Sequence, residues 1–405
     1  MQRGIEAVDY ISDGAAKDRV DLDLQLALGP CLIATQGPAS SVAVATFARA
    51  RKLCEQLGDP PEYLQVMHWH SVVLAVRGEL PQAREGSATL LALAAARGDR
   101  PALLTAFRAV GLMNPLTGRI VEAREMTERT VKEFSARNDV ERAAARAAGQ
   151  DAGAAGLAVM SWALWLLGYP DQAVERMVAA LQRADAVKHP HTQAYVSYYA
   201  SVLYALRGEA AVAHSHAERC LLLSEEHGFR QWQGLARVMG GVSATASSET
   251  VDQVMSRWDE CRGLGYQMSI TATDVLLNDE LLIQHEFDTA SEVIEQGFLK
   301  CSVNSERCFE AEPYRLKALE VHLSNKSDAG VDRQALLNRA LTIAKSQNAR
   351  SLELRVARDL ACLWRDQGNR TDARDLLARI YDWFTEGFDT LDLKESTALL
   401  EQLKA

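Results

Sequence analysis

The chain has 405 residues, is 48% hydrophobic and carries a formal net charge of −10 at pH 7. Its length and apolar content allow several domains or one long array with a large buried core. The acidic charge and the lack of a basic stripe argue against nucleic acid or an anionic membrane surface as a partner. No run of about 18 apolar residues predicts a membrane-spanning helix. Seven scattered cysteines and an N-terminus without an apolar signal core predict a cytoplasmic protein.

A short motif recurs along the chain: an apolar run ends at a glycine, and an alanine follows five residues later. Its copies are Gly78 and Ala83, Gly118 and Ala123, Gly168 and Ala173, Gly208 and Ala213, and Gly368 and Ala373. A sixth copy keeps Ala290 but has His285 in place of the glycine. Glycine can adopt the left-handed conformation that ends a helix, and a small alanine lets the next helix pack closely against the first. Each copy therefore predicts a helical hairpin.

The spacing of the motif predicts a repeat near forty residues. Gly78 to Gly118 and Gly168 to Gly208 are each forty residues, and the longer step between them indicates an insertion ending in a loop near 149–156. Weaker units span 21–57, 230–264 and 311–347. A stub helix is expected to end near Asp13, and a final helix should span about 392–403, capped by Thr390 or Asp392.

Helical hairpins that cannot bury their apolar faces alone stack on their neighbours. The expected fold is therefore all-α, a right-handed α-solenoid of about nine stacked hairpins with an extended concave surface. We divide this one continuous solenoid into N-terminal repeats over 1–152 and C-terminal repeats, with a capping helix, over 153–405.

The motif resembles tetratricopeptide repeats with a longer unit. Three stretches, Ala48 to Asp59, Trp162 to Val174 and Glu353 to Leu403, resemble the C-terminal repeats of bacterial class III adenylate/guanylate cyclases that carry a predicted signal-transduction ATPase module. In that family a cyclase domain and the ATPase module precede the repeats. This chain has neither, and no glycine in it is followed by lysine, so a phosphate loop is absent. The resemblance implies a stand-alone or truncated regulatory part without catalytic or cofactor-binding residues.

Aromatic residues on first helices are candidate anchors for a partner, because the resemblance places first helices on the concave surface. The candidates are Trp162, Tyr195 and Tyr198. Core packing between repeats is the alternative; both interpretations stay open for the two tyrosines, while core packing is favoured for Trp165 and Tyr204.

Three arginines, Arg355, Arg358 and Arg365, share one face of the first helix in the last repeat. They could bind a partner carboxylate. A solvated face paired with Glu353, Asp359 and Asp366 is the favoured alternative.

Three His-x-His pairs invite a metal hypothesis: His68 with His70, His189 with His191, and His214 with His216. Helical residues two apart point roughly 200° away from each other, so surface or turn histidines are favoured over a metal site. We expect no metal, no cofactor and no catalytic residue.

The predicted function is a non-catalytic protein-interaction scaffold in bacterial signalling, which binds a partner segment or domain in its concave groove. The alternative is the regulatory C-terminal portion of a class III adenylate/guanylate cyclase with an ATPase module, acting in cyclic-nucleotide signalling. A helical metal-dependent hydrolase is a third hypothesis. The oligomeric state is left open.

Overall fold

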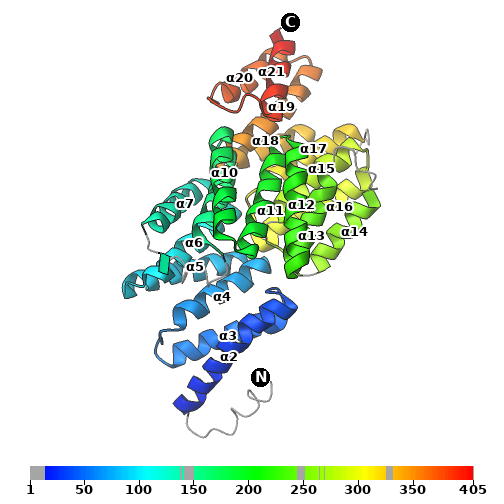
Figure 1. Cartoon of the computed structure of the whole chain (residues 1–405). Helices are drawn as coiled ribbons and strands as arrows, with labels where there is room; N and C mark the ends of the chain where they lie inside the picture. Colours follow the sequence, from blue (N-terminus) through cyan, green and yellow to red (C-terminus); the bar gives the residue numbers. More distant parts are fainter. Residues whose placement is uncertain are drawn as a thin grey trace.

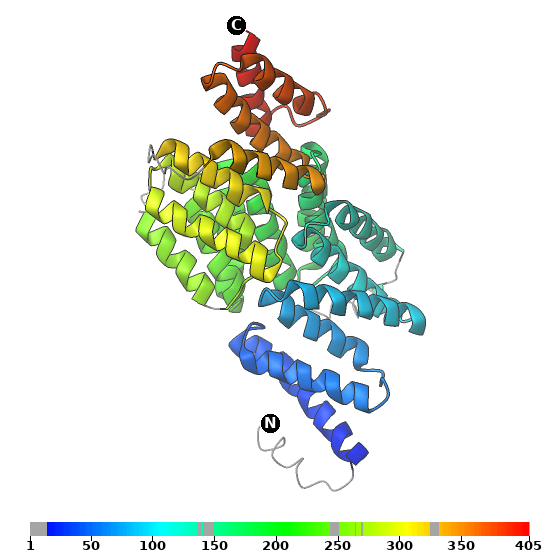
Figure 2. The same cartoon turned by 180° about the vertical axis from the view of Figure 1, so that it is seen from behind.

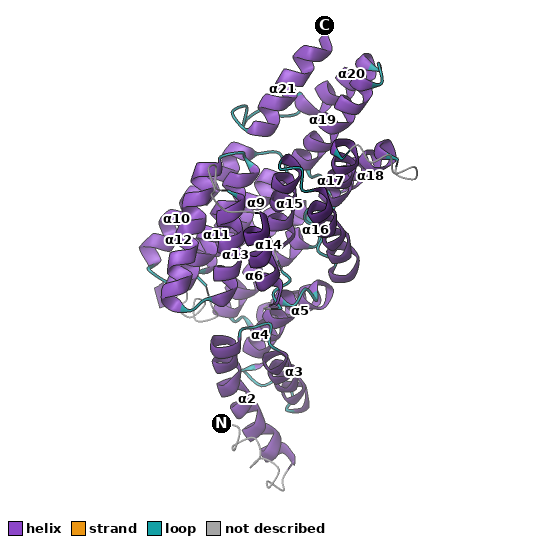
Figure 3. Ribbon diagram, turned by 90° about the vertical axis from the view of Figure 1, so that its right-hand side faces the viewer, coloured by secondary structure: helices purple, strands orange, loops and turns teal. Residues whose placement is uncertain are grey.

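The computed structural model describes residues 14–136, 139–140, 150–243, 251–263, 265–268, 270–324 and 332–404. Within these ranges all regular elements are helical and no strand occurs (Figure 3). No described helix is both long and apolar enough to cross a bilayer.

The described helices form nine hairpins and a terminal helix (Figure 1). In chain order the hairpins are α2 (Gly14–Gln36) with α3 (Ser41–Gln56), α4 (Tyr63–Val76) with α5 (Leu80–Arg97), α6 (Arg100–Leu116) with α7 (Ile120–Ser135), α9 (Ala152–Leu166) with α10 (Pro170–Val187), α11 (Pro190–Leu206) with α12 (Ala210–His227), α13 (Arg230–Val242) with α14 (Val251–Gly263), α15 (Ile270–Ile283) with α16 (Phe287–Leu299), α17 (Ala311–Leu323) with α18 (Arg333–Ser346), and α19 (Arg350–Asp366) with α20 (Arg370–Tyr381). The π-helix η1 (Lys300–Asn304) extends α16, and α21 (Leu391–Lys404) ends the chain. The predicted helical solenoid is confirmed.

The recurring motif has the geometry that its sequence predicts. Gly168 has φ +88°, Pro170 begins α10, and Ala173 is fully buried. The other motif glycines, at positions 78, 118, 208 and 368, also have positive φ, and every motif alanine is fully buried. His285 takes the glycine's left-handed conformation, with φ +62°.

One sequence prediction at an element boundary needs correction. The loop expected to end near 149–156 gives way to helix at Ala152, because the Asp151 carboxylate accepts a hydrogen bond from Ala154 N at 2.9 Å and caps α9. Residues 141–149 lie outside the described ranges, as does the predicted stub helix before Gly14. The domain division at residue 152 stays a prediction.

The solenoid coils back onto itself, so that turns far apart in sequence meet. Val76 O accepts from Gln267 N at 2.7 Å, and Leu116 O accepts from Arg307 N at 2.7 Å. The same pattern continues at later turns, where Trp165 O accepts from Ser351 Oγ and Arg207 O accepts from Leu391 N at 3.2 Å. From each of these hydrogen bonds to the next, both the acceptor and the donor move along the chain by about forty residues. One superhelical turn therefore lies on the next with an offset of almost five repeats.

This coiling covers most of the expected concave surface. Every residue of α9 is buried, α9 contacts α19, and α11 contacts α15. Seen from behind, the yellow helices of the later turn lie over the green ones (Figure 2). The prediction of an extended concave surface is therefore wrong along these helices, because the following superhelical turn covers them.

A buried charged cluster lies beside one of the inter-turn contacts. Lys300 Nζ pairs with Asp274 Oδ2, and both side chains are almost fully buried. Glu306 is 1% exposed and directly precedes Arg307, which bonds to Leu116. Burial raises the pKa of Glu306 to about 7, although the Lys300 ammonium opposes that rise.

Two motif glycines allow a matched test of the inter-turn contact. A Cβ at Gly168 would lie 2.5 Å from Trp383 Cζ3, whereas a Cβ at Gly368 would meet no atom within 4 Å. Both residues have similar positive φ, so alanine costs each roughly 1 kcal/mol of backbone strain. We expect Gly168→Ala to lower the free energy of unfolding by about 1–3 kcal/mol more than Gly368→Ala. Equal losses in urea titrations would mean that the turns do not meet as described.

The raised pKa of Glu306 predicts a pH dependence of stability. Between about pH 4.5 and 7 the folded state holds a proton that the unfolded state has lost, so stability falls as pH rises through this window. The wild type should lose up to roughly 3 kcal/mol relative to Glu306→Gln across that window. Melting both proteins at several pH values checks this, and parallel pH profiles would contradict it.

Candidate functional site

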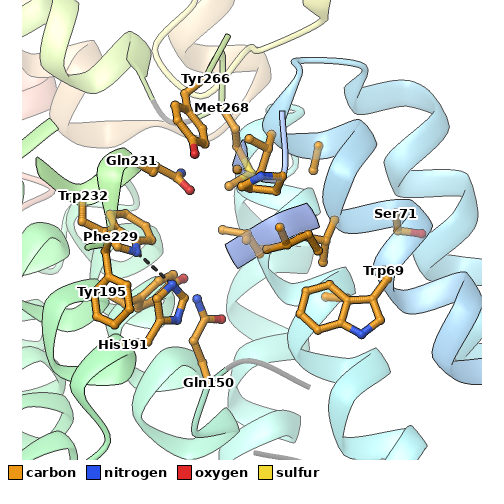
Figure 4. Close-up of a pocket in the computed structure, with 18 of the residues that line it drawn as sticks. Trp69, Ser71, Gln150, His191, Tyr195, Phe229, Gln231, Trp232, Tyr266 and Met268 are labelled. Carbon is orange, nitrogen blue, oxygen red and sulfur yellow. Dashed lines mark hydrogen bonds between the residues drawn. The ribbon is translucent and has the colours of Figure 1, made fainter. Parts of the chain in front are cut away.

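A pocket of about 370 Å³ opens into the solenoid interior between its N-terminal and middle hairpins. Its lining comes from the end of α2, from α4, α6 and α11, from the start of α13, and from the segment joining α14 to α15 (Figure 4). The last segment is held in place by the hydrogen bond from Gln267 N to Val76 O. The inter-turn contact thus builds one side of the pocket.

Aromatic side chains form two facing walls. Trp69 of α4 stands on one side of the gap, and Tyr195, Phe229 and Trp232 stand on the other (Figure 4). Trp69 stacks on Phe47 with ring centroids 6.1 Å apart, which fixes its orientation from behind. Both walls are apolar and pack against other side chains of the chain, which hold the rings in the orientations described.

A histidine and a tryptophan join the second wall to α11. Trp232 Nε1 donates to His191 Nε2 at 3.0 Å, so His191 accepts at that nitrogen. The Tyr195 ring meets Trp232 edge-on, with centroids 5.5 Å apart. These contacts lock the wall into one arrangement.

The lining holds two arginines: Arg230 at the start of α13, which is exposed, and Arg108 of α6, which is buried. Arg108 is 8% exposed, and its Nη1 donates to Gln150 Oε1 at 2.8 Å. Among the described residues, no carboxylate forms an ion pair with it, in contrast to the buried Arg315 and Arg355. Burial lowers the pKa of Arg108 below its usual range, and the nearby Tyr195 and Tyr199 oppose that shift.

Comparisons with known proteins give distant structural matches. No protein-family model matches the chain, and no curated protein matches it. A Rap protein complexed with competence and sporulation factor is 10% identical, with a TM-score of 0.40 over 96% of this chain and 98% of that one. The Rap conjugation gene regulator of the plasmid pLS20, in complex with the Phr* peptide, is 11% identical, with a TM-score of 0.48 over 95% and 96%.

A third match, the tetratricopeptide repeat domain of P58(IPK), is 14% identical with a TM-score of 0.22 over 94% of this chain and 99% of that one. Such low identities and TM-scores below 0.5 carry no argument about function. The resemblance to cyclase-associated repeats stays a prediction, and the pocket is the feature of the molecule that points to a function.

The predicted aromatic anchors lie in one buried cluster. Trp162 is 4% exposed, and its Nε1 donates to Tyr199 O at 3.0 Å. Tyr198 has no exposed surface, and its hydroxyl bonds to Thr273 Oγ1 at 3.1 Å. Tyr195 is 2% exposed and lines the pocket. The structure thus favours core packing for Trp162 and Tyr198, while a partner-binding role for Tyr195 stays a prediction.

The predicted arginine site is mostly occupied from within the chain. Arg355 is buried, with its Nε donating to Asp392 Oδ2 at 2.8 Å and its Nη2 to Leu206 O at 2.9 Å. Arg358 also contacts Asp392, at 3.3 Å. Burial alone would raise the pKa of Asp392, but the two guanidinium groups outweigh it and hold that pKa below its usual range.

These contacts correct two expectations. Arg355 is buried rather than on a solvated face. Asp392 is a partner of Arg355 rather than the cap of α21. Thr390 does precede α21, and its hydroxyl donates to Gly387 O at 2.7 Å. Arg365 keeps its predicted neighbour, Asp366, at 2.9 Å, and it also donates to Gln402 at 3.0 Å. Arg358 likewise lies 3.7 Å from its predicted neighbour Asp359.

The His-x-His pairs occupy helices and their caps. His68 and His70 are buried in α4 instead of on the surface, because α4 packs against α3, α5 and α6. His189 caps α11 by accepting from Thr192 N, and His214 and His216 lie on α12. In the part of the chain that the structure describes, no three His, Cys, Asp or Glu side chains gather to hold a metal ion.

Sequence reasoning missed most of the pocket. Arg108, Gln150, Phe229 and Trp232 gave no periodic or motif signal. His191 was noticed only as half of a His-x-His pair. These residues come together through the curvature of consecutive hairpins, and Tyr266 and Met268 join them through the contact between superhelical turns. No local pattern encodes either arrangement.

The ion pair between Arg355 and Asp392 of α21 predicts that removing Arg355 will strongly lower stability. Arg355→Ala leaves the buried Asp392 carboxylate with a weaker partner, so unfolding should become easier by roughly 3 kcal/mol or more. Arg365→Ala, with its exposed partners, should cost about 0.5 kcal/mol or less. Guanidinium titrations followed by tryptophan fluorescence measure both. Equal losses of unfolding free energy in the two variants would contradict a stabilising role of the ion pair between Arg355 and Asp392.

Proposed function

We propose that the chain is a non-catalytic protein-interaction scaffold that binds a segment of a partner protein in the pocket. The observation that carries this proposal is the preformed pair of aromatic walls. Their side chains are ordered by core contacts, so binding would order few further groups. Large aromatic side chains are also the residue types that dominate binding energy at interfaces.

The size of the pocket supports a segment rather than a whole domain. A cavity of about 370 Å³ holds a few side chains of an extended or turned segment. The first helices α9 and α11, which a larger partner would use, are covered by the next superhelical turn.

The polar groups of the lining support a non-catalytic role. Ser71 Oγ donates to Met67 O at 2.9 Å, and Ser87 Oγ donates to Ala83 O at 2.8 Å, each within its own helix. A hydroxyl engaged in this way is not hydrogen-bonded to a base, as an activated nucleophile would be.

The stretch from Glu353 to Leu403 resembles the repeats of bacterial class III cyclases. That resemblance supports a narrower proposal, in which the scaffold serves a bacterial signalling system in the cytoplasm. The alternative keeps the same fold and makes the chain the regulatory portion of a class III cyclase. Adding the purified chain to a cyclase catalytic domain separates the two, because only a regulatory portion changes the rate of cyclic-nucleotide formation.

Truncating both walls tests the pocket. A random peptide library, displayed with its C-terminus fused to the carrier, is selected on the wild-type protein. The double variant Trp69→Ala/Phe229→Ala should bind the selected peptides about thirtyfold more weakly or worse, since each anchor typically contributes 1 kcal/mol or more.

A matched control uses exposed residues on the outer face of α10. Arg176→Ala/Gln182→Ala should leave peptide affinity unchanged, and unaltered melting temperatures must show that each variant is folded. Peptides that bind the pocket variant as well as the wild type, or no selected peptides at all, would refute the pocket as the binding site.

A further inference from the structure

Among the residues that the structure describes, Arg108 is a buried cation without a counter-charge. Its side chain lines the pocket, yet within the described ranges its hydrogen-bonding partner is the neutral amide of Gln150. A guanidinium has five N–H donors in a planar fork, so most of its donor capacity is unused here. Burying an unpaired charge is costly, and folded proteins normally pair such a group.

Comparison with the other buried arginines shows how unusual this is. Arg315 is paired with Glu312 at 2.7 Å and with Asp279 at 2.9 Å. Arg355 is paired with Asp392 at 2.8 Å. Each of these lies inside the packed solenoid, whereas Arg108 faces a cavity that is open to a ligand.

The surroundings of Arg108 define what can approach it. Gln150, its hydrogen-bonding partner, lies between the two aromatic walls in Figure 4. A group that reaches the guanidinium therefore has apolar surface on either side, Trp69 on one and Tyr195 with Trp232 on the other.

We propose that the bound segment carries an internal acidic side chain, Asp or Glu, between apolar residues, and that the Arg108 guanidinium receives its carboxylate. This inference rests on the function proposed above. A carboxylate matches the guanidinium fork bidentately. The two walls take the flanking apolar residues, which is why the acid belongs inside the segment rather than at its end. Exclusion of water by those residues strengthens the ion pair.

The experiment compares selections on three proteins: the wild type, Arg108→Met and Arg108→Lys. The library is fused through its C-terminus, so that no peptide in it has a free terminal carboxylate. On the wild type we expect enrichment of sequences with one Asp or Glu flanked by apolar residues. Replacing that acid by its amide should weaken binding at least tenfold, as expected for loss of a charge-assisted hydrogen bond.

The variants supply the matched readouts. On Arg108→Met the preference for an acid should disappear while apolar peptides still bind, and Arg108→Lys should keep part of the preference. Arg108→Met should melt no lower than the wild type, because a methionine replaces a desolvated charge with an apolar chain of similar length. That result separates loss of recognition from loss of folding.

Two outcomes would overturn the inference and leave the proposed function standing. One is enrichment of apolar peptides without an acid. The other is a preference for acid seen only with a second library that has free C-termini, which would place the charge at the end of the segment. If no peptide is enriched on any of the three proteins, the inference and the proposed function both fail.

Discussion

Hydrogen bonds between successive turns of the superhelix set the form of this molecule. Carbonyl groups at or beside the ends of four first helices, Val76, Leu116, Trp165 and Arg207, accept bonds from residues almost five repeats later. Those carbonyls belong to the group that a helix leaves unsatisfied at its C-terminus. The later turn therefore both satisfies them and covers the helices they end. The motif glycines permit this approach, since a Cβ at Gly168 would collide with Trp383.

The same contacts explain why the interior is closed in one place and open in another. Around α9 and α11 the later turn brings in α15 and α19, and the aromatic cluster of Trp162, Tyr198 and Tyr199 becomes core. Closer to the N-terminus the first hairpins diverge from the middle ones, and the space between them remains as the pocket. Both superhelical turns contribute residues to the pocket, so a ligand bound there would contact both turns.

Buried charges have two different roles in this chain. Arg355 and Arg315 form ion pairs with carboxylates on other helices. These pairs link α19 to α21 and α17 to α15. Arg108 is buried, has no such partner within the described part of the chain, and lines the pocket. The contrast separates charges that stabilise the solenoid from a charge that would gain most from a bound carboxylate. It also makes Arg108 a residue whose removal should affect recognition rather than folding.

The sequence by itself determined the local architecture: helical hairpins, their number and their turns. These follow from glycine conformation, alanine size and apolar spacing, which act over a few residues, and even His285 occupies the glycine's position as expected. Tertiary structure decided which faces are buried. Tyr198 and Arg355 sit at positions that face a groove in a single repeat, yet Thr273 and Leu206 meet them from far along the chain. The pocket depends on the superhelical offset, a sum of small rotations between hairpins that no single motif specifies.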